Sequence, residues 1–168
     1  MPERETVRRA QRDLKEGKSP STAAGEFVRE EIDHVREGKH GARSPQQAIA
    51  IGLSKARRAG VPLRPPKKGK TKESTRTSAE RDYEAGQAGT KASPSPWASR
   101  ARGRALKQEP RTSASHQALS RQASRSARER GAEDRQKAAR KAVRTKGKSR
   151  LRQAGKKAAR THASRRAA

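Results

Sequence analysis

The feature that most constrains folding is the concentration of aliphatic side chains in residues 18–61, because the rest of the chain has little to bury. Hydrophobic residues make up 28% of the sequence and aromatic residues 2%, whereas a globular chain is usually about 45–50% apolar. Burial in such a chain cannot offset the conformational entropy of all its residues. We therefore expect one small folded module and disorder over much of the remaining length.

The first helix of this stretch is expected over residues 19–37. Ser19 or Ser21 can cap its start, Pro20 suits the first turn, and Gly38 can end it. Its other faces are acidic, and residues 19–37 carry a net charge of −3. Its apolar side chains recur every three or four residues and so share one face: Ala24, Phe27, Val28, Ile32 and Val35.

The second helix of the stretch is expected over residues 44–60, which carry a net charge of +3. Ser44 is the predicted N-cap, Pro45 follows it, and Gln47 stands where a capping-box partner reaches back. Gly60 can end the helix. The apolar faces of the two helices can close on each other as an antiparallel hairpin, since the turn between them is short.

The predicted fold class is all-α. It is a small N-terminal helical hairpin, with a third short helix over residues 3–16 as the open alternative, followed by a largely disordered basic tail with nascent helix. The expected domains are a helical module (1–61), a linker rich in Pro, Ser and Lys (62–103), and a Lys/Arg/Ala-rich tail (104–168). A module of about 60 residues is marginally stable alone, so we also expect a homodimer through it.

The charge balance indicates a polyanionic partner. The chain has 44 Lys and Arg against 17 Asp and Glu, a net charge of +27, and residues 62–168 hold +23 of it. No acidic residue follows Asp134. Dense cations of this kind bind phosphates with salt-dependent affinity and little sequence preference. The predicted contacts in the tail are Lys137, Arg140, Lys141, Arg144, Lys146, Lys148, Arg150, Arg152, Lys156, Lys157 and Arg160.

These features predict a non-enzymatic nucleic-acid-binding protein. Duplex DNA is favoured over RNA because aromatic residues, on which single-stranded bases stack, are scarce; Trp97, in the Ser-Pro-Ser-Pro-Trp segment 93–97, is the candidate for stacking. The helix over 44–60 offers Lys55, Arg57 and Arg58 as further contacts, and it would read bases if the hairpin were a helix-turn-helix. The alternatives are an RNA- or ribosome-associated protein, and a protein-interaction module that uses the acidic helix 19–37.

The sequence gives no sign of other chemistry. It has no cysteine, and Glu30 and His34, one helical turn apart, are too few to predict a metal site. We find no catalytic residues, cofactor motif or small-molecule substrate site. The first residues lack an apolar signal core, and no run approaches the roughly 20 apolar residues that cross a bilayer. The expected location is the cytoplasm, on the bacterial nucleoid, with no membrane partner.

Residues 16–66 contain GEFVREEI, HVREGKHGARS and QAIAIGLSKARRAGV. In these motifs the segment resembles an uncharacterised bacterial family of small basic proteins. The resemblance covers about the first two-fifths of the chain and implies a defined module without implying an activity. The tail separately resembles, in composition, the lysine- and alanine-rich tails of linker-histone-like bacterial proteins.

Overall fold

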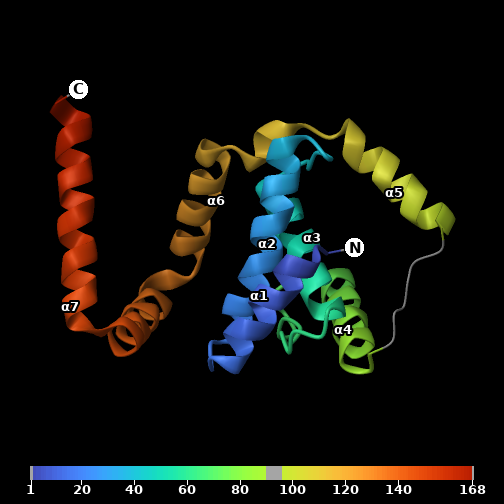
Figure 1. Cartoon of the computed structure of the whole chain (residues 1–168), viewed down its shortest axis with the longest axis horizontal. Coiled ribbons are helices and arrows are strands. Elements are labelled where there is room, and N and C mark those ends of the chain that lie inside the picture. The colour runs from blue at the N-terminus through green and yellow to red at the C-terminus, as the bar shows by residue number, and fades with distance from the viewer. Residues whose placement is uncertain (1, 90–95, 168) are drawn as a thin grey trace. The chain divides into compact units, whose positions relative to one another are not determined.

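The structure is a computed structural model that describes residues 2–89 and 96–167 (Figure 1). The chain divides into two compact units, Met1–Gln122 and Ala123–Ala168, and each is considered by itself. The described residues form seven α-helices and one 3-10 helix: α1 Arg4–Lys15, α2 Pro20–Glu37, α3 Pro45–Arg58, α4 Glu73–Gln87, α5 Pro96–Gln108, η1 Arg111–Ala114, α6 His116–Glu129 and α7 Gly131–Ala167.

The centre of the first unit is the pair α2 and α3. The predicted end of α2 at Gly38 and the predicted cap of α3 at Ser44 are confirmed, whereas Ser19 precedes α2 without a side-chain capping bond and α3 ends at Arg58, short of residue 60. Gly38 ends α2 in the left-handed region, with φ 77°, a conformation that costs glycine little. Ser44 caps α3, and its Oγ accepts a hydrogen bond of 3.2 Å from the Gln47 backbone N–H. The Gln47 side chain reaches back as predicted, although its Oε1 accepts from the backbone N–H of Arg43 at 2.7 Å.

The helices α2 and α3 approach each other most closely at Gly52. A Cβ atom on Gly52 would lie 2.6 Å from Val28 Cα, well inside the usual 3.5–4.0 Å between carbon atoms. The absence of a side chain at this position therefore lets the two backbones touch. Before this point Ala48 shares a buried cluster with Val35, and after it Ala56 shares one with Phe27, so the helices run antiparallel.

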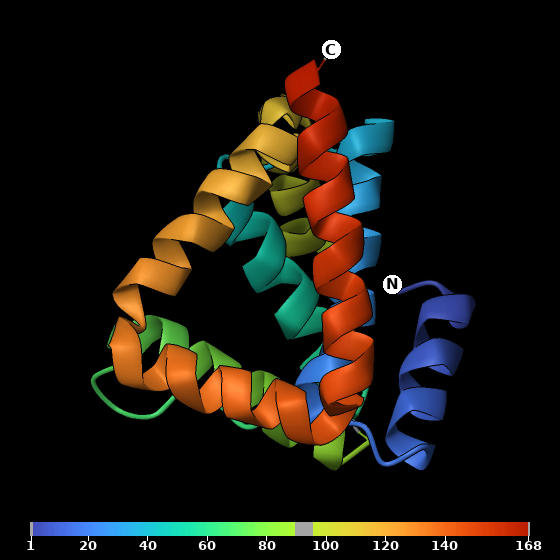
Figure 2. The same ribbon diagram turned by 90° about the vertical axis from the view of Figure 1, so that its left-hand side faces the viewer.

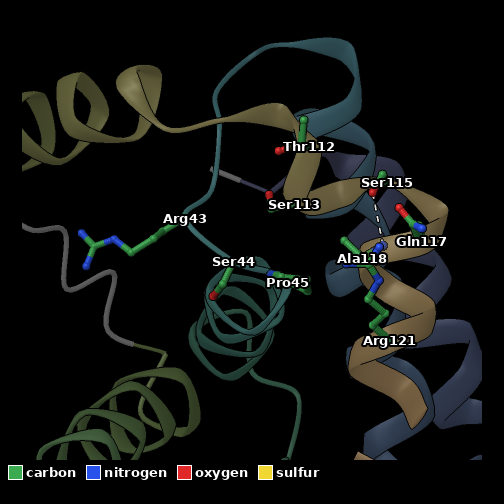
Figure 3. Close-up of a pocket in the computed structure, with 9 residues that line it drawn as sticks. All are labelled: Arg43, Ser44, Pro45, Thr112, Ser113, Ser115, Gln117, Ala118 and Arg121. Atoms are coloured by element: carbon green, nitrogen blue, oxygen red, sulfur yellow. Dashed lines mark hydrogen bonds between the residues drawn. The ribbon is translucent and has the colours of Figure 1, made fainter. Parts of the chain in front are cut away.

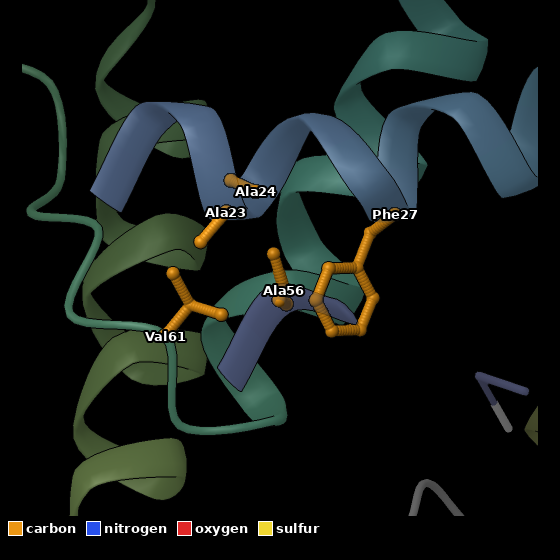
Figure 4. Close-up of a cluster of buried hydrophobic side chains, with 6 residues drawn as sticks. Ala23, Ala24, Phe27, Ala56 and Val61 are labelled. Carbon is orange, nitrogen blue, oxygen red and sulfur yellow. The ribbon is translucent and has the colours of Figure 1, made fainter. Parts of the chain in front are cut away.

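The main core is built largely from alanine. Phe27 is its one fully buried aromatic side chain, and Val61, just after α3, lies at the left of the cluster in Figure 4, across Ala56 from the Phe27 ring. The helix α1 covers the core with Ala10, and Val7 and Leu14 pack beside it. Small side chains bring the helices close together but bury little apolar area each, so the core is tight rather than large. Its buried members are Ala10, Ala23, Ala24, Phe27, Ala56 and Val61.

The helix α4 packs on α3 on the side away from α1. A glycine again sets the contact, because a Cβ on Gly86 would collide with the backbone carbonyl of Arg57. Asp82 of α4 fixes the pair by accepting from Arg58 Nε at 2.6 Å and from Ser54 Oγ at 2.5 Å. The region expected as linker therefore contributes a helix to the first unit.

Residues 106–114 also belong to the first unit. Ala114 is fully buried in a second cluster with Val35, Ala42 and Ala48, and its carbonyl accepts from Arg36 Nε at 2.9 Å. The turn after α2 is held as well, because the Gly41 and Ala42 N–H groups donate to the carbonyls of residues 106 and 110. The prediction of a disordered tail from residue 104 is therefore wrong for this segment, whose alanines and backbone groups complete the core.

The second unit contains the end of α6 and the long helix α7. Gly147 interrupts α7 with φ 73° and ψ 154°, a combination that is essentially restricted to glycine. Figure 2 shows the resulting change of direction between the orange and red parts of α7. The expectation of disorder with only nascent helix is wrong here too. Ala, Arg, Lys and Gln are strong helix formers, and repulsion of about 0.2–0.5 kcal/mol per like-charged pair does not outweigh them.

The prediction of a helical hairpin is also wrong, since α1, α4 and η1 pack directly on α2 and α3.

The functional division into module, linker and tail at residues 61 and 103 stays a prediction. Among residues 2–89 and 96–167, no helix is both long enough and apolar enough to span a bilayer.

Candidate nucleic-acid interface

The first half of α7, before Gly147, carries a cationic face. Lys137, Arg140, Lys141 and Arg144 are all exposed, and each lies three and four residues from two of the others. Such spacings place side chains on the same side of a helix. Lys137 has acidic neighbours, with its Nζ 3.9 Å from Glu133 and 3.8 Å from Asp134, and no carboxylate side chain follows these two in the sequence.

The second half of α7, after Gly147, carries a second cationic face. Lys148, Arg152, Lys156 and Arg160 occur at every fourth position and are exposed, so they lie within roughly a third of the helix circumference. The remaining predicted cations, Lys146, Arg150 and Lys157, are also exposed but fall on other sides. The structure therefore orders the eleven predicted tail contacts into two four-membered cationic faces and three flanking residues.

The three cations predicted on α3 are engaged within the first unit. Lys55 Nζ lies 2.5 Å from Glu31 Oε2. The Arg57 side chain is buried, its Nε donates to the Leu63 carbonyl at 3.1 Å, and desolvation lowers its pKa. Arg58 pairs with Asp82. These side chains hold α3 against its neighbours, and we do not include them in the proposed interface.

Trp97 stands in the first turn of α5 with 75% of its surface exposed. Residues 93–95, the Ser-Pro-Ser that precedes Pro96 in the predicted stacking segment, lie outside the part of the chain that the structure describes. The exposed indole is free to stack, but a single ring gives no platform for successive bases.

A polar pocket of about 310 Å³ opens between the start of α3 and the turn from η1 into α6 (Figure 3). Figure 3 shows the Arg43 side chain directed away from the other lining residues, and its Nε lies 3.3 Å from Glu109 Oε1. The two arginines of the pocket therefore do not converge on one point, and we assign it no ligand. Its lining is Arg43, Ser44, Pro45, Thr112, Ser113, Ser115, Gln117, Ala118 and Arg121.

A second polar cluster, which the sequence did not predict, lies between α2 and the turn after it. Glu31 Oε1 lies 3.1 Å from His40 Nε2. His34, which lies on α2 with Glu31, completes a group in which one potential ligand atom of each residue lies within 4.8 Å of the others. His34 Nε2 also lies 3.1 Å from Glu3 Oε1. That contact, followed by the hydrogen bond from Lys39, lowers the pKa of Glu3. The spacing of Glu31 and His34 was visible in the sequence, but the return of His40 was not.

Comparison with models of protein families, with curated proteins and with solved structures finds no match to this chain. The resemblance of residues 16–66 to a bacterial family, and of the tail to linker-histone-like proteins, therefore stays a prediction.

Proposed function

We propose that the chain is a non-enzymatic protein that binds the phosphate backbone of nucleic acid, with duplex DNA as the preferred form, through the two cationic faces of α7. The observation that carries the proposal is the ordering of eight exposed cations into these faces, in a region where no carboxylate follows Asp134. Helical order strengthens the case, because the cations need little further organisation on binding. A protein of this kind would act on the bacterial nucleoid.

The proposal predicts how affinity depends on salt. If each of the eight cations neutralises one phosphate, the logarithm of the affinity falls with the logarithm of salt concentration with a slope of about −7 for duplex DNA. Between about 50 and 200 mM salt this slope corresponds to a loss of about 10⁴ in affinity. Little preference between unrelated sequences is expected, because phosphate contacts carry no base information.

The test is fluorescence anisotropy with a labelled duplex and the full-length chain across a salt series. Replacing Lys137, Arg140, Lys141 and Arg144 by Gln removes one face and is expected to change the slope to about −4. The matched control is K67Q/K68Q/K70Q/K72Q, which removes the same charge from exposed lysines elsewhere and should leave the slope near −7. Equal losses in both variants would show that net charge, not the α7 faces, drives binding.

The same charges allow binding to RNA or the ribosome, so duplex DNA and a structured RNA of equal charge should be competed directly. A lack of large aromatic side chains on α7 supports the duplex, since single strands are bound largely by stacking. Tighter binding of the RNA would move the proposal to an RNA-associated role through the same faces.

The alternative of a protein-binding acidic helix receives less support. Each of the five acidic side chains of α2 has a cationic partner within the chain: Glu26 with Arg9 at 2.7 Å, Glu30 with Lys55 at 3.8 Å, Glu31 with Lys55 at 2.5 Å, Asp33 with Arg36 at 3.8 Å and Glu37 with Lys39 at 3.0 Å. A basic partner would have to displace these contacts before it could bind the helix.

A further inference from the structure

We propose that Glu31, His34 and His40 bind one divalent transition-metal ion, with Zn²⁺ as the expected occupant. Glu31 and His34 lie one turn apart on α2, and the left-handed turn at Gly38 brings His40 back beside them. The site is sheltered, since the side chains of Glu31, His34 and His40 are only 1%, 13% and 16% exposed. This inference is independent of nucleic-acid binding by α7.

The hydrogen bonding of His40 favours a metal ligand. Its Nδ1 lies 3.0 Å from the Gly41 carbonyl oxygen, and only a protonated Nδ1 can donate to that acceptor. In the neutral ring the lone pair is then on Nε2, which faces Glu31 Oε1 at 3.1 Å. Two electron-rich atoms at this distance repel each other unless a proton or a metal ion lies between them. Metal-bound histidines are commonly held by a donated bond from their other nitrogen to a backbone carbonyl.

The charges around the site favour binding of a cation. Glu30 and Glu31 have side chains only 2% and 1% exposed, and the ammonium of Lys55 lies 3.8 Å and 2.5 Å from them. One lysine cannot neutralise two buried carboxylates, and uncompensated buried charge is costly. Lys55 Nζ forms an ion pair with Glu31 Oε2, while Oε1 faces His40 Nε2.

The donor set and its dimensions select the metal. Two imidazole nitrogens and one carboxylate oxygen suit Zn²⁺, whereas Mg²⁺ and Ca²⁺ prefer oxygen ligands throughout. Tetrahedral Zn²⁺ with bonds of about 2.0–2.1 Å places its ligand atoms roughly 3.3 Å apart, and the three atoms here lie within 4.8 Å of one another. The fourth ligand of the ion would be water or Glu3, whose Oε1 lies 3.1 Å from His34 Nε2. The bound ion would tie the turn after α2 to the helix.

The test uses the full-length chain without a histidine tag, stripped with EDTA and titrated with ZnCl₂ against a fluorescent zinc chelator. We expect one site per chain, and a loss of affinity of at least about tenfold in His40→Gln, since even outer partners of a metal site contribute 10–100-fold. The matched control removes two exposed histidines outside the cluster, H116Q/H162Q, and should keep the site. Mg²⁺ should not compete for it.

A second variant and a spectrum keep the proposal open to refutation if His40→Gln fails to fold. His34→Gln removes the histidine ligand that lies on α2 instead of the one in the turn and should weaken binding similarly. Co²⁺ bound to the parent chain should show the visible absorption of a four-coordinate site. The proposal is overturned if no stoichiometric Zn²⁺ binds, or if affinity is the same in H34Q, H40Q and the H116Q/H162Q control. In that case His40 is a protonated partner of Glu31 rather than a ligand.

Discussion

Replacement of Gly52 by alanine tests whether direct backbone contact sets the crossing of α2 and α3. Inside a helix this change normally stabilises by about 1 kcal/mol. Here the new Cβ would lie 2.6 Å from Val28 Cα, 2.9 Å from Val28 N and 3.0 Å from the Phe27 carbonyl oxygen. Carbon atoms keep about 3.5–4.0 Å apart, so the helices would have to separate by about 1 Å.

The magnitude follows from these opposing effects. Overfilling a packed core costs about 1–3 kcal/mol, and the upper end applies because the obstructing atoms are backbone and cannot rotate away. After the gain in helix propensity, the free energy of unfolding should fall by about 2 kcal/mol. For a unit of this size the melting temperature should fall by about 8 °C.

The matched control is Gly25→Ala on α2, where a Cβ would meet nothing within 4 Å. The same chemical change should stabilise there, by about 0.5–1 kcal/mol. Amide hydrogen exchange of peptides from α2 and α3, read by mass spectrometry, reports the opening of this pair separately from α7. If Gly52→Ala slowed exchange as much as Gly25→Ala does, the close crossing of the two helices would be refuted.

Two further predictions concern charged side chains of the first unit, and in both the stability is measured in the presence of EDTA. Lys55→Met leaves the buried Glu31 carboxylate without its cation and should cost about 3 kcal/mol in urea unfolding at neutral pH; a change below about 0.5 kcal/mol would show that the pair is not buried in solution. Contacts with His34 and Lys39 lower the pKa of Glu3 from its ordinary value of 4.5, so its stabilising contribution is present above pH 4.5 and lost as the pH falls through the lowered value. Glu3→Gln should therefore be less stable than the parent at pH 6 and equally stable in strong acid, and a deficit that persisted in acid would contradict this.

The parts of the fold that could be predicted are those with strong local signals. Ser44 and Gly38 mark helix ends because capping hydrogen bonds and left-handed backbone favour these residue types. The stripe containing Phe27 and Val35 predicted the buried face of α2 correctly, because large apolar side chains at helical spacing usually pack into a core.

The contacts that escaped prediction are made by small residues. Gly86 and Ala114 belong to no recognisable hydrophobic pattern. Even so, a Cβ on Gly86 would collide with the backbone of Arg57, and Ala114 is fully buried in the second cluster. Their role depends on which backbone lies opposite, and that information is not local in the sequence. Composition alone therefore suggested disorder for segments that complete the core.

The Glu31, His34 and His40 cluster was missed for a related reason. The first two residues are separated by one helical turn, a spacing that is common on any charged helix and carries little weight. The third becomes a neighbour only because Gly38 turns the chain and the backbone of residues 106–110 holds that turn in place. In α7, the cations themselves were evident from the sequence, whereas their division into two faces depended on where the helix bends.

The bend at Gly147 sets a length scale. A continuous helix of 37 residues would be a rod of about 55 Å at 1.5 Å per residue, longer than the roughly 34–36 Å of one turn of duplex DNA. Such a rod would leave the winding phosphate backbone at its ends. The glycine divides it into arms of about 24 and 30 Å, each shorter than a duplex turn. In the proposed complex with duplex DNA, each arm could therefore follow the phosphate backbone at its own angle.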